Sequence, residues 1–397
     1  MVARPPRAGH YDPGVSLGKA YLITGGLVRL YIVAGKETDS VTHGILPAAA
    51  ALGLDVTLLT DRAWPVDTVR CDVTDFRSII SAVGRGPAPA AIFSNSDHLQ
   101  APTALAAEFF GLPGKDWRAA LRTKNKALMR RALGGAYAAE LRPGEDPPAD
   151  APYPLVVKPR EGVASEDVFL VADAAELAAR CREIWARRAE PLVAEEYLPG
   201  ALHTLETLNG QVLGGFRTRV SAPPHFVEER LDWTTPPCAD QVLAALAALG
   251  VGFGACHTEY VVHEGRAQII EVNYRLIGDH CDFLLGDLLG VPIFEWVLRA
   301  HLGEPVPPVP AASGHAAVDS VIADRSGTLT AAPVRQECET DGVRLAYWPV
   351  RTAGDTIELT RTNRDYVGVI RAVGSDAAGV EAAIHGFRAR HAWKIVP

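Results

Sequence analysis

The sequence lacks the features that mark several large classes of protein. Its net charge is −8, so no global basic field points to a nucleic acid or an anionic membrane as partner. The six cysteines are scattered without C-x-x-C pairs or metal spacing, which argues for a reducing cytosol and against a disulfide framework or zinc site. No apolar run approaches the roughly 18–20 residues that span a bilayer, and the start, Met-Val-Ala-Arg-Pro-Pro-Arg, contains no signal-peptide core. We therefore expect a cytoplasmic protein without nucleic-acid or membrane partners.

What is present is the composition of a globular protein, with 48% hydrophobic and 22% charged residues in a chain of 397. That length allows two or three domains. Residues 1–18 are rich in proline and glycine and predict a loosely held arm. In residues 19–113 strands alternate with helices, which predicts a parallel sheet covered by helices. Its expected elements are Ala20–Thr24, Leu30–Val33, Val41–Leu52, Val56–Thr60, Ala90–Ser94 and Pro102–Phe110.

Glycines follow the first of these strands without forming a nucleotide fingerprint. Gly25-Gly26 lacks the rest of the G-x-G-x-x-G pattern, so we interpret it as a turn. The basic segment Trp117–Leu133 predicts one helix, and the proline-rich segment Arg142–Pro154 predicts a linker. Val168–Val171 is an expected strand, and Asp173–Glu176 is a capping box that opens a helix to about Ala189.

A lysine at the end of the buried strand that begins at Leu155 is unusual. Burying the ammonium of Lys158 costs several kcal/mol unless an anion meets it. The loop that follows, Arg160–Asp167, offers Gly162 and Ser165 as N–H and O–H donors. This segment is therefore a candidate anion-binding loop within a unit that we place at residues 114–190.

Residues 191–310 and 311–397 form the two remaining predicted units. In the first, Thr204–Leu208 and Val212–Phe216 flank Asn209-Gly210, a strong hairpin signal. Its other expected elements are a strand at Leu192–Tyr197, a polar loop at Arg217–Thr235 that carries His225, and a helix at Ala239–Leu249. The second unit follows the prolines of Pro305–Pro310 and predicts a strand-rich lobe, with strands at Val318–Ile322, Thr356–Leu359 and Tyr366–Val373 and one helix near Gly379–Arg388.

The densest chemistry lies in a predicted β-hairpin at residues 256–279. If residues 264–266 form its loop, Glu259 lies opposite Glu271 and the two carboxylates share a face. Asn273 follows on the same parity. Two carboxylates and an amide oxygen are the ligands that a hard divalent cation takes from a protein, with phosphates filling its other positions. The alternative is a polar edge that faces solvent.

Together these segments resemble the ATP-grasp superfamily over nearly the whole chain. The order matches: an α/β pre-domain, a lysine helix, Lys-Pro with a glycine/serine loop, a Glu-Glu-Tyr-Leu hinge and a Glu…Glu-x-Asn-x-Arg hairpin. The C-terminal lobe resembles that of the carboxylate–amine ligase branch, which includes L-amino-acid (dipeptide) ligases and siderophore or natural-product amide ligases. The resemblance implies an α/β pre-domain, two α+β subdomains that hold ATP between them, and a strand-rich C-terminal lobe.

The resemblance also implies roles for single residues. Lys126 and Lys158 stand where the family has its two ATP lysines, and the Gly162–Ser165 loop where it has the lid over the phosphates. That lid usually has a second glycine, whereas Glu166 and Asp167 stand here. The implied ATP-binding residues are Lys126, Lys158, Gly162, Ser165, Glu195, Glu196, Tyr197, Leu198 and His203, with a structural role for His203 left open.

By the same resemblance, Glu259, Glu271 and Asn273 match the Mg²⁺ ligands, with Mn²⁺ as a possible substitute. Arg275 matches the catalytic arginine that meets the transferring phosphoryl group and the substrate. His225 is placed like a substrate-loop histidine of dipeptide ligases, with an ordinary surface histidine as the alternative.

The implied activity is amide formation. ATP phosphorylates a carboxylate to an acyl phosphate, and an amine then displaces phosphate. We expect small-molecule carboxylate and amine substrates, amino-acid-like and in a biosynthetic pathway, and a possible homodimer. The alternatives are a ligase with a thiol acceptor and an ATP-binding protein without catalysis.

Overall fold

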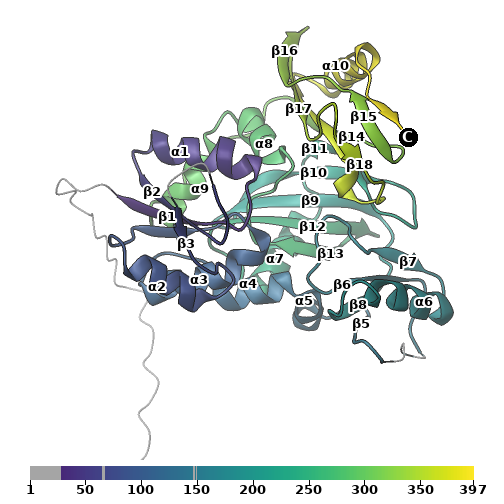
Figure 1. Cartoon of the computed structure of the whole chain (residues 1–397), viewed down its shortest axis with the longest axis horizontal. Helices are drawn as coiled ribbons and strands as arrows, with labels where there is room; N and C mark the ends of the chain where they lie inside the picture. The colour runs from purple at the N-terminus through teal and green to yellow at the C-terminus, as the bar shows by residue number, and fades with distance from the viewer. Residues whose placement is uncertain (1–27, 65–67, 146–147, 149) are drawn as a thin grey trace, which may run out of the picture.

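The computed structural model describes residues 28–64, 68–145, 148 and 150–397. The predicted arm at residues 1–18, the strand at Ala20–Thr24 and the Gly25-Gly26 turn lie outside the described residues. Figure 1 shows the N-terminal α/β unit on the left, the lid subdomain at the lower right and the C-terminal lobe above it. No helix in the described part of the chain combines the length and apolarity needed to cross a membrane.

The N-terminal unit is the predicted parallel sheet. Its strands run in the order β3-β2-β1-β4, and every pairing is parallel. The strands are β1 (Arg29–Val33), β2 (Asp55–Thr60), β3 (Thr68–Arg70) and β4 (Ala91–Phe93). The helical segments are η1 (Ser40–Ile45), α1 (Leu46–Ala51), α2 (Phe76–Gly84), η2 (Asp97–Leu99) and α3 (Gln100–Phe109). The helix predicted at residues 41–52 is thus present, but its first part, η1, is a π-helix.

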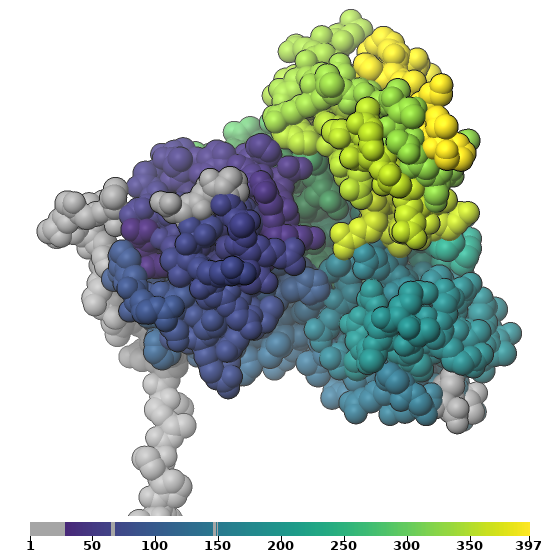
Figure 2. Space-filling view, viewed as in Figure 1, coloured from purple at the N-terminus to yellow at the C-terminus, as the bar shows by residue number. Residues whose placement is uncertain are grey.

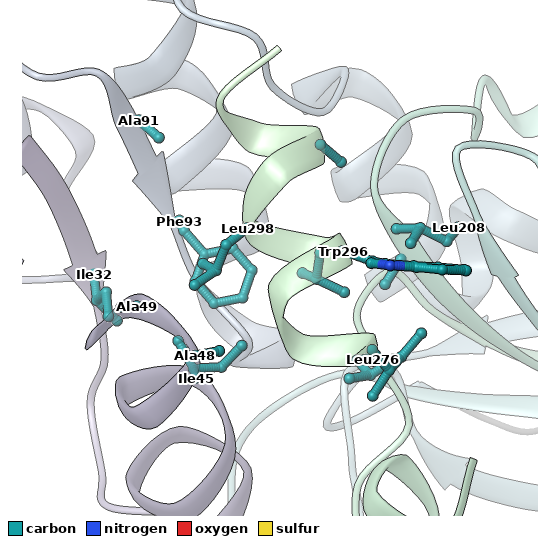
Figure 3. Packing of buried hydrophobic residues seen from close by; sticks show 14 of the residues in the cluster. Ile32, Ile45, Ala48, Ala49, Ala91, Phe93, Leu208, Leu276, Trp296 and Leu298 are labelled. Atoms are coloured by element: carbon teal, nitrogen blue, oxygen red, sulfur yellow. The ribbon is translucent and has the colours of Figure 1, made fainter. Parts of the chain in front are cut away.

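The two faces of this sheet are covered by different helices. One hydrophobic cluster joins the sheet to α2 and α3, and a second joins it to α1 and to α9 (Ile293–His301). In Figure 3, Leu298 of α9 lies against Phe93 of β4, whereas Trp296 lies near Leu208 of the large sheet. The helix α9 therefore ties the N-terminal unit to the sheet that carries the predicted metal hairpin.

The predicted helix at Trp117–Leu133 is wrong as a single element. The structure has two helices, α4 (Trp117–Lys124) and α5 (Lys126–Leu133), separated at Asn125. Asn125 has extended backbone dihedrals, and its side-chain oxygen accepts a hydrogen bond from the Leu128 N–H at 3.0 Å. Asparagine is a strong N-cap because its oxygen satisfies an unpaired N–H of the first turn. Charge and helix propensity alone did not reveal this break.

The lid subdomain is a four-stranded antiparallel sheet backed by one helix. Its strand order is β5-β8-β6-β7. The elements are β5 (Ala138–Leu141), β6 (Leu155–Pro159), β7 (Phe169–Val171), β8 (Leu192–Glu196) and α6 (Ala174–Trp185). The predicted capping box opens α6, because the Asp173 carboxylate accepts from the Glu176 N–H at 2.9 Å.

One nine-stranded sheet holds the rest of the site and continues into the C-terminal lobe. Its order is β13-β12-β9-β10-β11-β14-β19-β17-β16. The strands are β9 (Ala201–Leu208), β10 (Gln211–Val220), β11 (Glu228–Thr234), β12 (Ala255–His263), β13 (Arg266–Asn273), β14 (His315–Ile322), β16 (Gln336–Thr340), β17 (Val343–Pro349) and β19 (Tyr366–Gly374). The predicted division at residue 310 therefore falls inside one sheet.

Helices and a small sheet complete this region. The helical elements are α7 (Ala239–Leu249), α8 (Cys281–Leu289), α9, η3 (Asn363–Asp365) and α10 (Ala377–Arg390). A three-stranded sheet contains β15 (Gly327–Ala331), β18 (Thr356–Ile357) and β20 (Lys394–Val396).

The polar loop predicted at Arg217–Thr235 is also wrong for most of its length. The strand β10 continues to Val220, and β11 begins at Glu228 and pairs with it. Along this end of β10, Arg217 is exposed and Thr218 is buried, the alternation of a half-buried strand. The high charge of the exposed positions hid that alternation in the sequence.

Candidate active site

The hairpin β12–β13 brings Glu259 and Glu271 opposite each other, as predicted. Its turn has two residues rather than three, because residues 264–265 both take positive φ, as in a type I′ turn. From the turn to the pair Tyr260–Ile269 the two strands keep one register. A bulge then leaves Ile270 without a partner, and the register beyond it is shifted by one residue. Since a one-residue shift moves every later side chain to the other face, the bulge brings the two carboxylates together.

A buried histidine lies beside Glu259 on the same face. His257 Nδ1 is 2.8 Å from Glu206 Oε1, and its Nε2 is 3.4 Å from Glu259 Oε1. Burial opposes the charged form, but the carboxylates of Glu206 and Glu259 raise the pKa of His257 to about 10. Sequence reasoning missed Glu206. The β9–β12 pairing places it directly across from His257, and no local sequence signal indicates that pairing.

Lys126 links α5, the lid and the hairpin. Its Nζ is 2.9 Å from Glu271 Oε1 and donates to the Gly162 carbonyl at 3.2 Å. Only 3% of Lys126 is exposed. Burial opposes its charge, but the Glu271 carboxylate raises the pKa of this lysine above its ordinary value. The N-cap at Asn125 fixes the start of α5, so the helix break sets where this ammonium stands.

The second predicted lysine pairs with a hinge residue. Lys158 Nζ and Arg130 Nη2 lie 3.0 Å and 2.9 Å from Glu195 Oε2. Burial raises the pKa of Glu195, but Lys158 and Arg130 outweigh it and lower the pKa to about 2. Burial lowers the pKa of Lys158. Sequence reasoning missed Arg130, which also donates to the Ile269 carbonyl.

The backbone of the predicted hinge, residues 195–198, already makes hydrogen bonds within the protein at three of its four residues. Glu195 lies inside β8 and is paired on both sides within the sheet. The Glu196 N–H donates to the Tyr137 carbonyl at 3.0 Å, and the Tyr197 N–H to the Pro154 carbonyl at 3.1 Å. Within the described residues, the N–H of Leu198 has no such backbone partner.

The lid loop lies against the site with its two carboxylates turned to arginines. A Cβ at Gly162 would stand 3.1 Å from the Pro159 side chain, a tight contact that a side chain could form only if the proline shifted by a few tenths of an ångström. Ser165 Oγ donates to the Phe226 carbonyl at 2.9 Å. Glu166 and Asp167, the departures from the family pattern, form ion pairs with arginines at positions 187, 188 and 364.

Arg275 stands where the hairpin meets the carboxyl end of β4. Its Nη1 donates to the Leu276 carbonyl at 3.0 Å, and the Leu276 N–H donates to Asn95 Oδ1 at 3.2 Å. Asp97, on the same loop, is buried and forms an ion pair with Lys124. Burial opposes the effect, but Lys124 and then Arg275 lower the pKa of Asp97. Ligands of open α/β sheets bind at this end of the strands.

A further buried lysine, which sequence reasoning missed, supports the same segment. Lys115 Nζ donates to Gln100 Oε1 at 2.7 Å and to the Tyr274 carbonyl at 2.5 Å. Gln100 in turn donates to the carbonyls of Ser94 and Ser96 at the end of β4. Burial lowers the pKa of Lys115 to about 7. The backbone before Arg275 is therefore held from the N-terminal unit.

Glu228 is another residue that the sequence did not reveal. It begins β11, in the segment predicted to be a loop. Burial, followed by the charges of Glu259 and Asp279, raises the pKa of Glu228 to about 8. The Glu228 N–H donates to Asn363 Oδ1 at 3.0 Å, which joins this side of the site to the C-terminal lobe.

The two predicted histidines do not join the cluster of charged groups. The strand register pairs His203 with Tyr260, the neighbour of Glu259, so the His203 side chain points to the opposite face of the sheet. Its ring lies 5.9 Å from that of Tyr260, centroid to centroid. His225 lies in the loop between β10 and β11, with its ring 6.3 Å from that of Phe169. This placement of His203 favours the structural role that the sequence left open.

The donor set of the hairpin fits Mg²⁺. Glu259, Glu271 and Asn273 lie on one face and offer only oxygen ligands besides the amide nitrogen, as hard cations prefer. In the described part of the chain, no group of three or more His, Cys, Asp or Glu residues is arranged to hold a metal ion. All six cysteines, each within the described residues, are free. The site would therefore complete its coordination with the amide and with ligand oxygens.

Comparisons with known proteins agree on the fold. No family model matches the chain. An uncharacterized protein, y4rH, of Sinorhizobium fredii (strain NBRC 101917 / NGR234) is 29% identical over 288 residues, which are 66% of this chain and 60% of that protein. An L-amino acid ligase from Bacillus licheniformis is similar in structure, with a TM-score of 0.75, 21% identity, and coverage of 93% of this chain and 99% of that chain.

A third similar structure carries ligands. It is the biotin carboxylase domain dimer of 2-oxoglutarate carboxylase from Hydrogenobacter thermophilus, in complex with MgADP, ADP and bicarbonate. Its TM-score is 0.65 with 16% identity, and the match covers 94% of this chain and 92% of that one. The chain has the fold of the ATP-grasp ligases, with a parallel N-terminal sheet and a large antiparallel sheet.

Proposed function

We propose that the protein is an ATP- and Mg²⁺-dependent ligase that joins a small carboxylate, amino-acid-like, to an amine. The observation that carries this proposal is the position of Arg275, between the carboxylate hairpin and the carboxyl end of β4. A guanidinium that directly follows the hairpin, which carries two carboxylates, one of them the partner of the buried Lys126, suits a reaction in which anions must be brought together.

Nucleotide binding is assigned to the lysines, the lid and one hinge residue. Lys126 and Lys158 would release Glu271 and Glu195 in part and turn to the phosphates, which supply stronger anionic partners. The N–H of Leu198 is the candidate to read the adenine edge. Glu259, Glu271 and Asn273 would hold Mg²⁺, which when bound neutralises the phosphate charge.

The chain's own residues position the reacting groups. In the proposed reaction, a carboxylate oxygen forms a bond to the γ-phosphorus of ATP while the bond from that phosphorus to ADP breaks. The amine then bonds to the acyl carbon, the bond from that carbon to phosphate breaks, and the amine loses a proton. Arg275 would donate two parallel N–H groups to the transferring phosphoryl oxygens and to the acyl phosphate.

Two alternatives keep the same nucleotide site. A thiol acceptor in place of the amine would use the same acyl phosphate, and a non-catalytic ATP-binding protein would use only the lysines and the hinge. The presence of Arg275 and both hairpin carboxylates favours a ligase over a non-catalytic protein. The L-amino acid ligase among the similar structures favours an amine over a thiol as the acceptor. A cytoplasmic location and a homodimer remain predictions.

The test is a screen for acid-dependent ADP release. Purified full-length protein is given ATP, Mg²⁺ and a panel of amino-acid-like carboxylates, each with an amine, a thiol or no acceptor. We expect ADP release that requires one class of acid and one class of amine, with an amide product by mass spectrometry. Binding of ATP without ADP release under any combination would refute the ligase and favour the non-catalytic alternative, and a thioester product would favour the thiol acceptor.

A further inference from the structure

A preorganised turn of the C-terminal lobe, residues 360–365, faces the lid subdomain. Asp365 is 2% exposed and accepts from the Thr360 hydroxyl at 2.8 Å and from the Thr360 N–H at 2.9 Å. The Thr362 hydroxyl caps η3 by accepting from the Arg364 N–H at 3.1 Å. The turn is therefore held by its own hydrogen bonds, and its tip needs little further ordering to bind a neighbour.

The tip of this turn contacts the lid loop. The Asn363 N–H donates to the Ala164 carbonyl at 3.2 Å, and Arg364 Nε donates to Glu166 Oε1 at 2.6 Å. Arg364 and Glu166 are 198 residues apart in the sequence. In Figure 2 the lobe, coloured green to yellow, lies directly on the teal lid subdomain. The Asn363 side chain also accepts from the Glu228 N–H, so one residue joins the lid to the far side of the site.

The lid loop reaches the catalytic groups at its other end. The Gly162 carbonyl accepts from Lys126 Nζ, the lysine that also contacts Glu271. Next to the tip of the turn, Ser165 donates to the Phe226 carbonyl of the β10–β11 loop. The lid is thus held on one side by the site and on the other by the C-terminal half of the chain.

The backbone of the lid explains why it needs such support. Ala164, Ser165 and Asp167 have φ of +58°, +55° and +55°. Residues with a Cβ rarely adopt this left-handed conformation, whereas glycine adopts it without strain. A conformation of this kind persists only where surrounding contacts impose it. Glycine would allow the loop to adopt this conformation without help. Because residues with a Cβ stand here instead, contacts with other residues must stabilise the conformation.

The residues that replace glycine also provide those contacts. Glu166 pairs with Arg364 at 2.6 Å and with Arg188 at 3.7 Å. Asp167 pairs with Arg187 at 2.6 Å and with Arg188 at 3.3 Å. Glu166, one of the two residues that depart from the family pattern, is therefore also the residue that pairs with the C-terminal lobe.

We propose that the C-terminal lobe acts as a latch for the lid. Asn363 and Arg364 are positioning residues that hold residues 164–166 closed over the phosphate side of the site, and Asn363 couples that closure to Glu228. The inference rests on the proposed function only in naming what the lid covers. The contacts themselves join only residues of this chain, so they are testable without catalysis.

The first test is hydrogen exchange of the lid in the full-length, ligand-free protein. Arg364→Gln removes the latch ion pair, and the matched control is Arg325→Gln, which removes the exposed Asp324–Arg325 pair of the same lobe. We expect amide exchange in residues 161–168 to rise by about 2- to 5-fold in Arg364→Gln, the factor that one exposed ion pair contributes. The control should match wild type. Equal lid exchange in all three proteins would overturn the latch.

The second test is a double-mutant cycle on nucleotide affinity. ADP with Mg²⁺ is titrated into wild type, Glu166→Gln, Arg364→Gln and the double variant. We expect each single change to weaken binding by about 2- to 5-fold, and Arg364→Gln to add nothing in the Glu166→Gln background. Additive losses, or no loss, would contradict the proposal. A wild-type chain that exchanges as expected but never releases ADP would refute the ligase and leave the latch standing.

Discussion

In the proposed reaction, Arg275 is the residue on which phosphoryl transfer would depend most directly. Its backbone is fixed on both sides, by Lys115 at the Tyr274 carbonyl and by Asn95 at the Leu276 N–H. A donor that is already oriented does not have to reorganise when charge develops, and such preorganised donors contribute most to catalysis. The side chain is part of the site, while its supports come from the N-terminal unit.

Removal of the Arg275 guanidinium should lower the reaction rate without weakening nucleotide binding. We expect Arg275→Ala to lower the rate of acid-dependent ADP release by about 100- to 1000-fold, the range for loss of one preorganised charge donor. The affinity for ADP with Mg²⁺ should change little, because the lysines and the metal ligands remain. Steady-state kinetics and calorimetry measure the two quantities, with Arg325→Ala as a surface control. An unchanged rate would remove Arg275 from the mechanism.

Lys115 gives a pH-dependent prediction. Burial lowers its pKa to about 7 in the folded chain, below the ordinary value of 10.5. Between these values the unfolded chain binds one proton more, so the free energy of unfolding rises with pH by up to about 1.4 kcal/mol per pH unit. Below pH 7 both states are charged, and the full cost of burying the ammonium is present.

The variant Lys115→Met should lack this pH-dependent contribution to the free energy of unfolding. Urea unfolding at pH 7, 8 and 9 measures the difference in unfolding free energy between the variant and wild type. We expect the unfolding free energy of Lys115→Met minus that of wild type to be larger at pH 7 than at pH 9. The reason is that only wild type becomes more stable as Lys115 loses its proton. A difference that stays constant from pH 7 to 9 would show that Lys115 does not titrate there.

At the scale of elements, irregularities in helices and strands position the site. The break between α4 and α5 sets the start of the helix that carries Lys126, and the bulge in β13 turns Glu271 toward Glu259. Regular versions of both elements would place these side chains elsewhere. Each irregularity has a local cause: a cap at Asn125 and a two-residue turn that leaves the strands one residue out of register.

The cap gives a prediction at this scale. Asn125→Ala should lower the free energy of unfolding by about 1 kcal/mol, the usual value of an N-cap. It should also weaken ADP binding, because a continuous helix moves the Lys126 ammonium. The matched variant is Asn125→Asp, which keeps a capping oxygen and should retain both properties. Chemical denaturation and calorimetry measure these effects. Equal behaviour of the two variants would contradict this account of the break.

At the scale of the whole molecule, the site is assembled from distant segments. The N-terminal unit supports Arg275, α5 and the lid carry the two lysines, and the large sheet carries the metal hairpin. Binding of MgATP should therefore hold several units together. We expect ATP with Mg²⁺ to raise the melting temperature more than ATP with EDTA does, measured by thermal shift.

Glu259→Gln is the variant that tests the role of the metal in that stabilisation. The amide keeps the size of the side chain but loses the charge that a hard cation requires. The extra shift with Mg²⁺ should then be reduced, whereas Glu264→Gln, at the exposed hairpin turn, should behave as wild type. An undiminished Mg²⁺ effect in Glu259→Gln would remove that residue from the metal site.

Much of this assembly was predictable, because the signals were local. The hairpin at Asn209-Gly210 and the parallel sheet follow from turn chemistry and alternation. The pairing of Glu259 with Glu271 was predicted from a three-residue loop at residues 264–266, whereas the structure reaches the same pairing through a two-residue turn and a bulge. The face of His203, the break at Asn125 and the strand β11 were not predicted. Each depends on register or on a cap, which single-residue patterns do not specify.

Three charged groups, Glu206, Glu228 and Lys115, were also missed, for a different reason. Their chemistry comes from neighbours distant in the sequence: Glu206 from His257, Glu228 from Glu259, and Lys115 from Tyr274. An isolated glutamate or lysine on a strand or loop resembles any solvated charge. Only the fold shows which of these charged groups are desolvated and lie next to a partner.

The nine-stranded sheet has a mechanical consequence. Because β11 pairs directly with β14 of the C-terminal lobe, the part of the sheet that carries the β12–β13 hairpin and the lobe cannot hinge apart without breaking a ladder of backbone hydrogen bonds. The sheet therefore acts as a fixed frame, and in the proposed function the lid subdomain would be the part that moves when nucleotide enters or leaves. A chain cut at residue 310 would lose that frame and expose the edge of β11, an open template for aggregation.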